Sequence, residues 1–142
     1  MSDLTTAFRL DKRVAMITGG GSGIGKGIAE SMAAVGARVA IADTNIEAAA
    51  ATVKELGLQG REAIAIDMDV TDSAQVQRGV DELIATWGQI DALVNSAGIA
   101  IKNTALDYLE DDWDRIIAVN LKGTFLPMQI VARHMVERGS GK

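Results

Sequence analysis

The chain has 142 residues, 48% of them hydrophobic and 23% charged, a composition typical of one globular domain with a buried core. Its net charge of −5 and the lack of a basic face argue against a protein that binds nucleic acid. The absence of cysteine excludes disulfides, thiolate catalysis and cysteine-ligated metals, and the single histidine, His134, gives little basis for a metal site, so we expect none.

The chain shows no apolar run of the roughly 18 residues that a membrane span needs. Its first residues, MSDLTTAFRLDKRV, lack the apolar core of a secretory signal. We therefore expect a soluble cytoplasmic protein that does not contact a membrane.

Apolar segments with strand character alternate with amphipathic segments from residue 13 onward. The sequence predicts strands at 13–18, 37–43, 61–68 and 90–95, and helices at 23–36, 45–56, 73–87, about 107–119 and 121–138. Thr44 and Glu47 have the spacing of a capping box, and Gly57 can end the helix that they begin. Pro127 is unfavourable in the last helix unless it lies in the first turn or at a kink.

The order of these segments predicts an α/β fold. Strands that alternate with helices are usually parallel and joined by right-handed crossovers. The predicted strands are nearly continuous apolar runs, as expected when helices cover both faces of a sheet. We therefore predict a doubly wound parallel sheet.

The glycine-rich stretch TGGGSGIG, residues 18–25, lies between the first strand and the first helix. Ligands of such sheets bind beyond the carboxyl ends of the strands. Glycine lets the backbone approach a ligand closely, and a helix N-terminus presents unpaired N–H groups to a phosphate. We interpret the stretch as a phosphate-binding turn of a dinucleotide site, the alternative being a tight turn only. A Walker P-loop is excluded, because Gly27 follows Lys26 where that motif needs Ser or Thr.

Asp43 ends the second predicted strand, 18 residues after Gly25. An acidic residue about 20 residues after a glycine-rich turn typically binds the ribose of a dinucleotide. Such a carboxylate can accept hydrogen bonds from both hydroxyls of the adenosine ribose and would repel a 2′-phosphate. No Lys or Arg lies within 18–25 or directly after Asp43, so the sequence favours NAD over NADP. Capping of the following helix is the alternative role of Asp43.

The spacing Gly19-x-x-x-Gly23-x-Gly25 resembles that of the short-chain dehydrogenase/reductase family. Three later stretches resemble family motifs in the same order: Asp69-Val70, Asn95-Ser96-Ala97-Gly98 and the Asn120 of VNLKG. Ser96 departs from the family, which has a second asparagine there. The resemblance covers nearly the whole chain and implies a Rossmann-type sheet with four strands in the order 3-2-1-4.

The resemblance also assigns roles to particular residues. It implies that the pyrophosphate and the neighbouring ribose are held by Gly19, Ser22, Gly23, Ile24 and Gly25. Asp43 would bind the adenosine ribose, and Asp69 and Val70 would flank the adenine. The nicotinamide half would be lined by Asn95, Ala97 and Gly98, although Asn95 could equally tie neighbouring strands together. Asn120 would be the active-site asparagine, which holds a water of the proton relay.

The chemistry of the family is hydride transfer between a nicotinamide and a carbonyl or secondary alcohol. A tyrosine acts as general acid and base, a lysine four residues later lowers its pKa, and a serine orients the substrate oxygen. Tyr108, the only tyrosine, does not fit, because it precedes Asn120 and is followed four residues later by Asp112. We therefore expect these residues to lie beyond Lys142, and the 142 residues to be an N-terminal part that is inactive alone.

The stretch FRLDKR and the Asn-Ser-Ala-Gly variant look most like sugar-alcohol dehydrogenases, which implies a polyol and its ketose as the substrate pair. Reduction of a 3-oxoacyl thioester, or a truncated nucleotide-binding module without catalysis, are the alternatives. In the family, the helix that corresponds to 121–138 packs between subunits, so we expect a homo-oligomer, a dimer or tetramer. The apolar residues Phe125, Met128, Ala132 and Met135 could form this contact or cover the chain's own sheet. Trp87 and Trp113 fit core positions, and His134 fits a structural role or a position at an interface.

Overall fold

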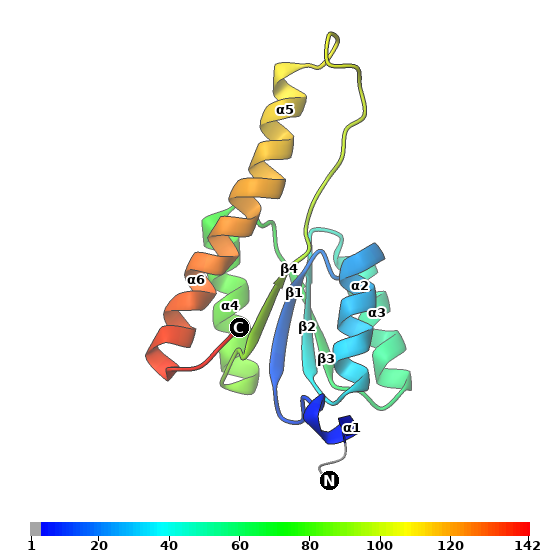
Figure 1. Cartoon of the computed structure of the whole chain (residues 1–142), viewed down its shortest axis with the longest axis vertical. Coiled ribbons are helices and arrows are strands. Elements are labelled where there is room, and N and C mark those ends of the chain that lie inside the picture. Colours follow the sequence, from blue (N-terminus) through cyan, green and yellow to red (C-terminus); the bar gives the residue numbers. More distant parts are fainter. Residues whose placement is uncertain (1–3) are drawn as a thin grey trace.

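A computed structural model describes residues 4–142 and places a four-stranded parallel sheet at the centre of the chain (Figure 1). The strands are β1 (Val14–Thr18), β2 (Arg38–Asp43), β3 (Ala63–Asp67) and β4 (Ala92–Asn95). Their order across the sheet is β3-β2-β1-β4, and every neighbouring pair is parallel. This arrangement confirms the predicted doubly wound sheet and its strand order.

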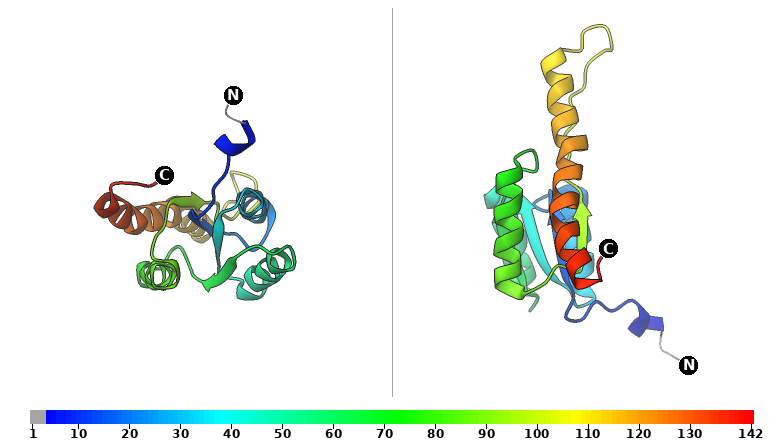
Figure 2. Two further views of the ribbon diagram at one scale, coloured as in Figure 1. Left: turned by 90° about the horizontal axis from the view of Figure 1, so that it is seen from below. Right: turned by 90° about the vertical axis from the view of Figure 1, so that its left-hand side faces the viewer.

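Helices cover both faces of this sheet, as seen from below in Figure 2. One face carries α2 (Gly23–Ala34) and α3 (Ile46–Leu58), and the other carries α4 (Ser73–Trp87) and α6 (Gly123–Arg138). Successive residues of β1 serve the two sides in turn, since Met16 belongs to the core under α4 and α6 and Ile17 to the core under α2 and α3. This two-sided burial explains why the strands are continuous apolar runs.

The structure shows which residues begin and end α3 (Ile46–Leu58) and α4 (Ser73–Trp87). The N-cap of α3 is Asn45, whose side chain accepts a hydrogen bond from the N–H of Ala48 at 3.0 Å, so the predicted capping box of Thr44 and Glu47 is wrong. Gly57 lies within α3, because the helix runs on to Leu58. Helix α4 has the predicted bounds 73–87. Its N-cap is Asp72, and hydrogen bonds from Gln75 and from the backbone lower the pKa of that carboxyl.

The last two predicted helices form one continuous rod. Helix α5 (Glu110–Ile117) passes through a π-helical turn, η1 (Ala118–Lys122), directly into α6. The predicted break at 120 is therefore wrong, because a single π-helical turn continues a helix instead of ending it. Pro127 lies buried at the fifth position of α6 and, because α5 and η1 precede α6 without a break, well inside the rod rather than in a first turn.

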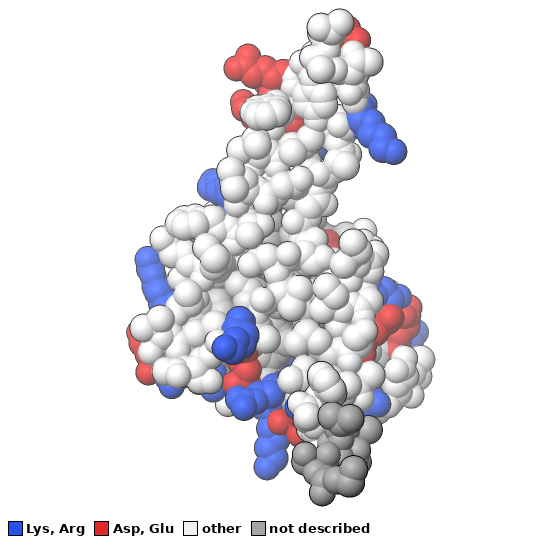
Figure 3. All heavy atoms as spheres, viewed as in Figure 1, with Lys and Arg blue, Asp and Glu red and all other residues white. Residues whose placement is uncertain are grey.

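The rod extends well beyond the carboxyl ends of the strands. Together with the loop that follows β4, helix α5 forms an arm that stands clear of the sheet (Figures 1 and 2). Figure 3 shows that much of the visible arm surface carries no charged group. Trp113 of the arm is 60% exposed, so its predicted core position is wrong, whereas Trp87, the last residue of α4, packs against the core.

At the other end of the rod the chain turns back onto the sheet. Gly139 ends α6 in the left-handed region, with φ +68°. Lys142 then lies beside β4, donating its N–H to the carbonyl of Asp91 and accepting from the N–H of Leu93, both at 3.0 Å. Among residues 4–142, no helix is both long enough and apolar enough to cross a lipid bilayer.

Candidate functional site

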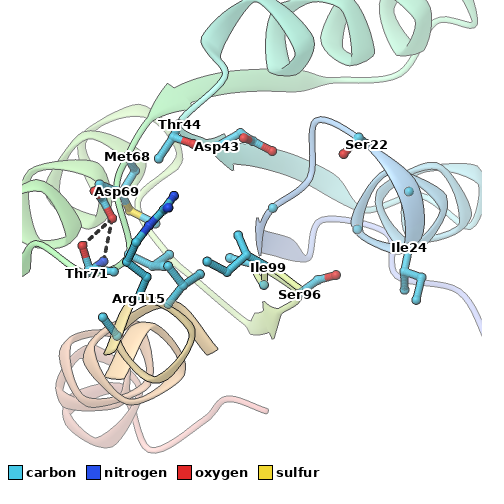
Figure 4. A pocket seen from close by; sticks show the side chains of 18 residues that line it. Ser22, Ile24, Asp43, Thr44, Met68, Asp69, Thr71, Ser96, Ile99 and Arg115 are labelled. Atoms are coloured by element: carbon cyan, nitrogen blue, oxygen red, sulfur yellow. Dashed lines mark hydrogen bonds between the residues drawn. The ribbon is translucent and has the colours of Figure 1, made fainter. Parts of the chain in front are cut away.

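A cavity of about 760 Å³ opens at the carboxyl ends of the four strands, where the sequence analysis places a ligand. Its walls come from the turns after the strands, the first turn of α2, and the α5–η1 segment (Figure 4). The predicted site residues that line it are Gly19, Ser22, Gly23, Ile24, Gly25, Asp43, Asp69, Val70, Ala97 and Gly98. Two predicted residues, Asn95 and Asn120, are not part of its lining.

The glycine-rich turn is shaped by close packing on one side and open space on the other. A Cβ at Gly25 would collide with the carbonyl of Gly19, so the turn can close only without a side chain there. Gly23 has φ +53°, a conformation that glycine adopts without strain, and a Cβ built on it meets nothing within 4 Å. The turn is therefore tightly packed at Gly25 and leaves open space at Gly23.

The first turn of α2 presents backbone N–H groups that no side chain caps. Its N-cap, Ser22, makes no side-chain capping bond. The first N–H groups of a helix have no intrahelical acceptor, and the helix dipole adds positive potential at the same point. This end of α2 can bind an anion such as a phosphate.

Asp43, at the end of β2, is held in place by the backbone. One carboxylate oxygen accepts from the N–H of Gly21 and the other from the N–H of Asn45, each at 3.0 Å. Because the N-cap of α3 is Asn45, Asp43 is not the residue that caps this helix. Its carboxylate is oriented at the cavity wall, and lone pairs beyond these two bonds can accept from a ligand's hydroxyl groups.

The turn after β3 is equally well ordered. Oδ1 of Asp69 accepts from the N–H and the hydroxyl of Thr71, each at 2.8 Å, and the Asp69 N–H donates to the side chain of Gln75 (Figure 4). Val70 is buried against the start of α6, where a side chain at position 123 would collide with it. The structure thus presents the Asp69 carboxylate and the Val70 backbone as a rigid edge of the cavity.

The segment after β4 is tied to its surroundings by two side chains. The hydroxyl of Thr18 accepts from the N–H groups of Ser96 and Ala97, at 3.1 and 3.2 Å. The amide of Asn120 accepts from the N–H of Ile99 at 2.8 Å and donates to the Ile99 carbonyl at 3.0 Å. These bonds fix the backbone of 96–99 between β1 and the π-helical turn. The sequence analysis did not single out this role of Thr18, although Thr18 begins the glycine-rich stretch.

Asn95 and Asn120 are the two predicted site residues outside the cavity lining. The side chain of Asn95 is exposed beside the cavity. Both ends of the Asn120 amide are used by Ile99, so this side chain holds a loop in the structure described here.

Sequence reasoning missed the contribution of the helical rod to the cavity. Arg115 of α5 and Ala118 and Val119 of η1 line its wall. Arg115 and Ala118 belong to no motif, and Val119 begins VNLKG but had no role assigned to it, because only the packing of the rod beside the sheet brings these residues to the site. Tyr108 does not line the cavity, and its hydroxyl donates to the carbonyl of Ile101 at 3.0 Å.

A second polar cluster lies at the opposite end of β4, away from the cavity. Asp91, only 7% exposed, accepts from the N–H of Val14 at 2.8 Å and from Gln89, and lies within 3.3 Å of Arg13 and 3.2 Å of Arg138. Burial acts to raise the pKa of Asp91, but the hydrogen bonds from Val14, Gln89 and the two arginines outweigh it and lower that pKa. The cluster joins β1, β4 and α6, and is structural.

His134 takes part in the same contact between α6 and β4. Its Nε2 accepts from the N–H of Ile90 at 3.2 Å, which agrees with the structural role predicted for it. The acidic start of α5 gives no sign of a metal centre, since no group of three or more potential ligands is brought together within residues 4–142.

The chain is similar to known dehydrogenases. A family model described as short chain dehydrogenase matches residues 13–142. The chain is 47% identical over 134 residues to sorbitol dehydrogenase of Cereibacter sphaeroides, covering 94% of this chain and 51% of that protein. It is 46% identical over 134 residues to D-threitol dehydrogenase of Mycolicibacterium smegmatis, covering 94% and 52%.

The same similarity is found among solved structures. A short-chain type dehydrogenase/reductase from Mycobacterium marinum superposes with a TM-score of 0.93 at 36% identity, covering 96% of this chain and 56% of that chain. The chain spans about half the length of the curated relatives it matches.

Proposed function

Because the chain belongs to the short-chain dehydrogenase family, we propose that it forms the cofactor-binding part of an NAD-dependent oxidoreductase. The observation that carries this proposal is that an uncapped helix N-terminus and an oriented carboxylate face one cavity at the strand ends. The residues present fit a dinucleotide, since the open space at Gly23 has room for a phosphate. Bound NAD would supply or accept the hydride.

Different residues of the cavity would bind different parts of the cofactor. The first turn of α2 would hold the pyrophosphate, and Asp43 would hold the adenosine ribose. The edge formed by Asp69 and Val70 would flank the adenine. Ala97 and Gly98, with Asn95 nearby, would lie along the nicotinamide half. These assignments rest on which lining residues lie at each strand end.

The preference for NAD over NADP rests on Asp43. Its carboxylate is held by two backbone N–H groups and cannot swing away without losing them. A 2′-phosphate on the same ribose would meet this negative charge at close range, where repulsion is only partly screened. The lining residues offer one basic side chain, Arg115, which comes from a different wall.

Proton transfer requires groups that the cavity lining does not contain. The lining includes no tyrosine, lysine or histidine. We propose that the catalytic serine, tyrosine and lysine belong to a part of the protein outside these 142 residues, and that this chain alone binds the cofactor without turnover. Asn120 would serve the reaction by holding Ile99, and with it the loop beside the nicotinamide half.

The proposed substrate is a polyol or sugar with a secondary alcohol, oxidised to the ketone. The names of the relatives, sorbitol dehydrogenase and D-threitol dehydrogenase, support this class. The test uses the protein at its full natural length and follows the absorbance of the reduced nicotinamide, with NAD or NADP and a panel of polyols in one direction and with NADH or NADPH and a 3-oxoacyl thioester in the other. NAD-dependent oxidation of a polyol is expected. A preference for NADPH and a 3-oxoacyl thioester would contradict both the cofactor and the substrate class.

We also propose a homo-oligomer in which a second copy covers the rod. The rod exposes large apolar side chains on α5, η1 and α6, namely Trp113, Ile117, Leu121, Phe125 and Met128. A patch of this kind commonly marks a protein interface. Met135, which the sequence analysis grouped with Phe125 and Met128, instead packs against the core, so the predicted apolar stripe is divided between two faces.

A further inference from the structure

Arg115 is the only lysine or arginine that lines the cavity. Figure 4 shows its side chain reaching from α5 toward the ends of β2 and β3, close to Met68 and Thr44 and far from Ser22 and Ile24. Within residues 4–142, no hydrogen bond or ion pair engages its guanidinium, although Asp111 and Asp112 lie one turn earlier on the same helix. The side chain therefore offers an unused positive charge to the cavity.

A role in stabilising the helix does not account for this position. Arg115 lies in the last turn of α5, where a positive charge would ordinarily favour the helix dipole. The helical backbone does not end there, because it continues through η1 and α6 to Arg138. Arg115 consequently does not stabilise the negative end of a helix dipole. The interaction partner that remains for its guanidinium is a ligand in the cavity.

The place of Arg115 in the cavity indicates which part of a ligand it meets. The end of the cavity that suits a phosphate is the first turn of α2, marked by Ser22 and Ile24 in Figure 4, and Arg115 lies on the other side. Its neighbours there are the turn after β3, with Asp69, and the wall formed by Ala118 and Val119. A flat base that lay along the Asp69–Val70 edge would have this wall beside it and Arg115 at its open face.

We propose that the guanidinium of Arg115 covers the adenine of the bound nucleotide. A guanidinium is planar and delocalised, is more weakly hydrated than an ammonium, and stacks on aromatic faces. Its charge also offsets the two carboxylates that line the cavity, those of Asp43 and Asp69. This inference rests on the proposed function, because it requires a nucleotide in the cavity, and it adds a residue that determines affinity for the base.

The test compares three ligands by isothermal titration calorimetry on the protein at its full natural length. The ligands are NAD, 5′-AMP, which contains the adenine half, and nicotinamide mononucleotide, which does not. Arg115→Ala should weaken NAD and 5′-AMP by about tenfold, within the range measured for loss of one aromatic stack on a base. Binding of nicotinamide mononucleotide should be unchanged. Arg133→Ala, which removes an exposed arginine of α6 outside the cavity, is the matched control and should change none of the three.

A second variant separates stacking from charge. Arg115→Lys keeps the charge and loses the planar group, so it should remain clearly weaker than wild type for 5′-AMP. Full rescue by lysine, with a loss in Arg115→Ala that disappears at high salt, would show a charge–phosphate contact and overturn the proposal. Unchanged 5′-AMP binding in Arg115→Ala would also overturn it. If the wild-type protein bound none of the three ligands, the proposed function itself would fail, a result distinct from an effect of Arg115. If Arg115→Ala did not fold, the lysine variant alone would decide.

Discussion

Asp43 is the residue proposed to select NAD over NADP, and Asp43→Ala tests this assignment. The carboxylate is proposed to accept hydrogen bonds from the adenosine ribose, and a hydrogen bond to a charged group contributes about 1.5–3 kcal/mol. At about 1.4 kcal/mol per tenfold, a loss of about 1.5–3 kcal/mol weakens NAD roughly 12- to 140-fold. NADP should lose far less or gain, because the same change removes the charge that opposes its 2′-phosphate. The dissociation constant for NADP divided by that for NAD should therefore fall.

The structure supplies a control for this experiment. Asp67 occupies the paired position on β3, directly beside Asp43 in the register of the sheet, is exposed, and does not line the cavity. Asp67→Ala removes the same charge from the same end of the sheet and should leave both dissociation constants within about twofold, since surface charges are well screened. Calorimetric titration of both nucleotides into wild type and the two variants measures these constants.

Asp43 also accepts from Gly21 and Asn45, so part of the effect of Asp43→Ala could come from a loosened turn. Asp43→Asn keeps one acceptor oxygen and separates the two contributions. A loosened turn should weaken NAD and NADP by the same factor, whereas loss of the ribose contact should weaken NAD selectively. Unchanged NAD affinity in Asp43→Ala, or equal losses for Asp43→Ala and Asp67→Ala, would refute the assignment of Asp43 to the ribose.

Three further changes test other parts of the structure. Asp91→Ala should lower the free energy of unfolding by about 3 kcal/mol, measured by urea titration, because the buried N–H of Val14 loses its acceptor and Arg138 its partner. Gly25→Ala should abolish nucleotide binding in calorimetry, since its Cβ would collide with the Gly19 carbonyl and reshape the turn. Phe125→Glu should reduce the molar mass found by analytical ultracentrifugation, because it places a charge in the exposed apolar patch of the rod.

For each of these three predictions, one result would contradict it. The folded pKa of Asp91 is lowered, so its contribution is complete above the unfolded pKa of about 3.9 and is lost as the pH falls below it. A stability difference between wild type and Asp91→Ala that persisted undiminished at lower pH would contradict the charge-based explanation. Normal NAD affinity in Gly25→Ala would show that the turn is more adaptable than its packing indicates. An unchanged mass for Phe125→Glu, with wild type oligomeric, would place the interface elsewhere.

Several local features of the site could be read from the sequence because they depend on neighbouring residues. The glycine-rich turn follows an apolar strand and precedes a helix, and the structure places that turn at the cavity. Asp43 ends β2 because the apolar run ends there. Even so, the capping box at Thr44 was wrong, since Asn45 makes the cap one residue later and both residues are suitable caps.

Features that depend on distant residues could not be read in this way. The two bonds between Asn120 and Ile99 join residues 21 positions apart, and neither residue shows in its own surroundings that the other is near. Trp113 has the apolar character of a core residue but lies on α5, in the arm that stands clear of the sheet, and is 60% exposed. The π-helical turn η1 joins two predicted helices into one rod, which the sequence pattern did not show.

The sequence by itself thus determined the alternation of strands and helices, the glycine-rich turn after β1 and the carboxylate at the end of β2. These follow from short-range periodicity and from the backbone freedom of glycine, which act over a few residues. The tertiary structure alone decided that α5 runs beside the strand ends and brings Arg115 to the cavity. The physical reason is that the position of a helix is set by the surfaces it buries against other elements, and those contacts join residues far apart in the chain.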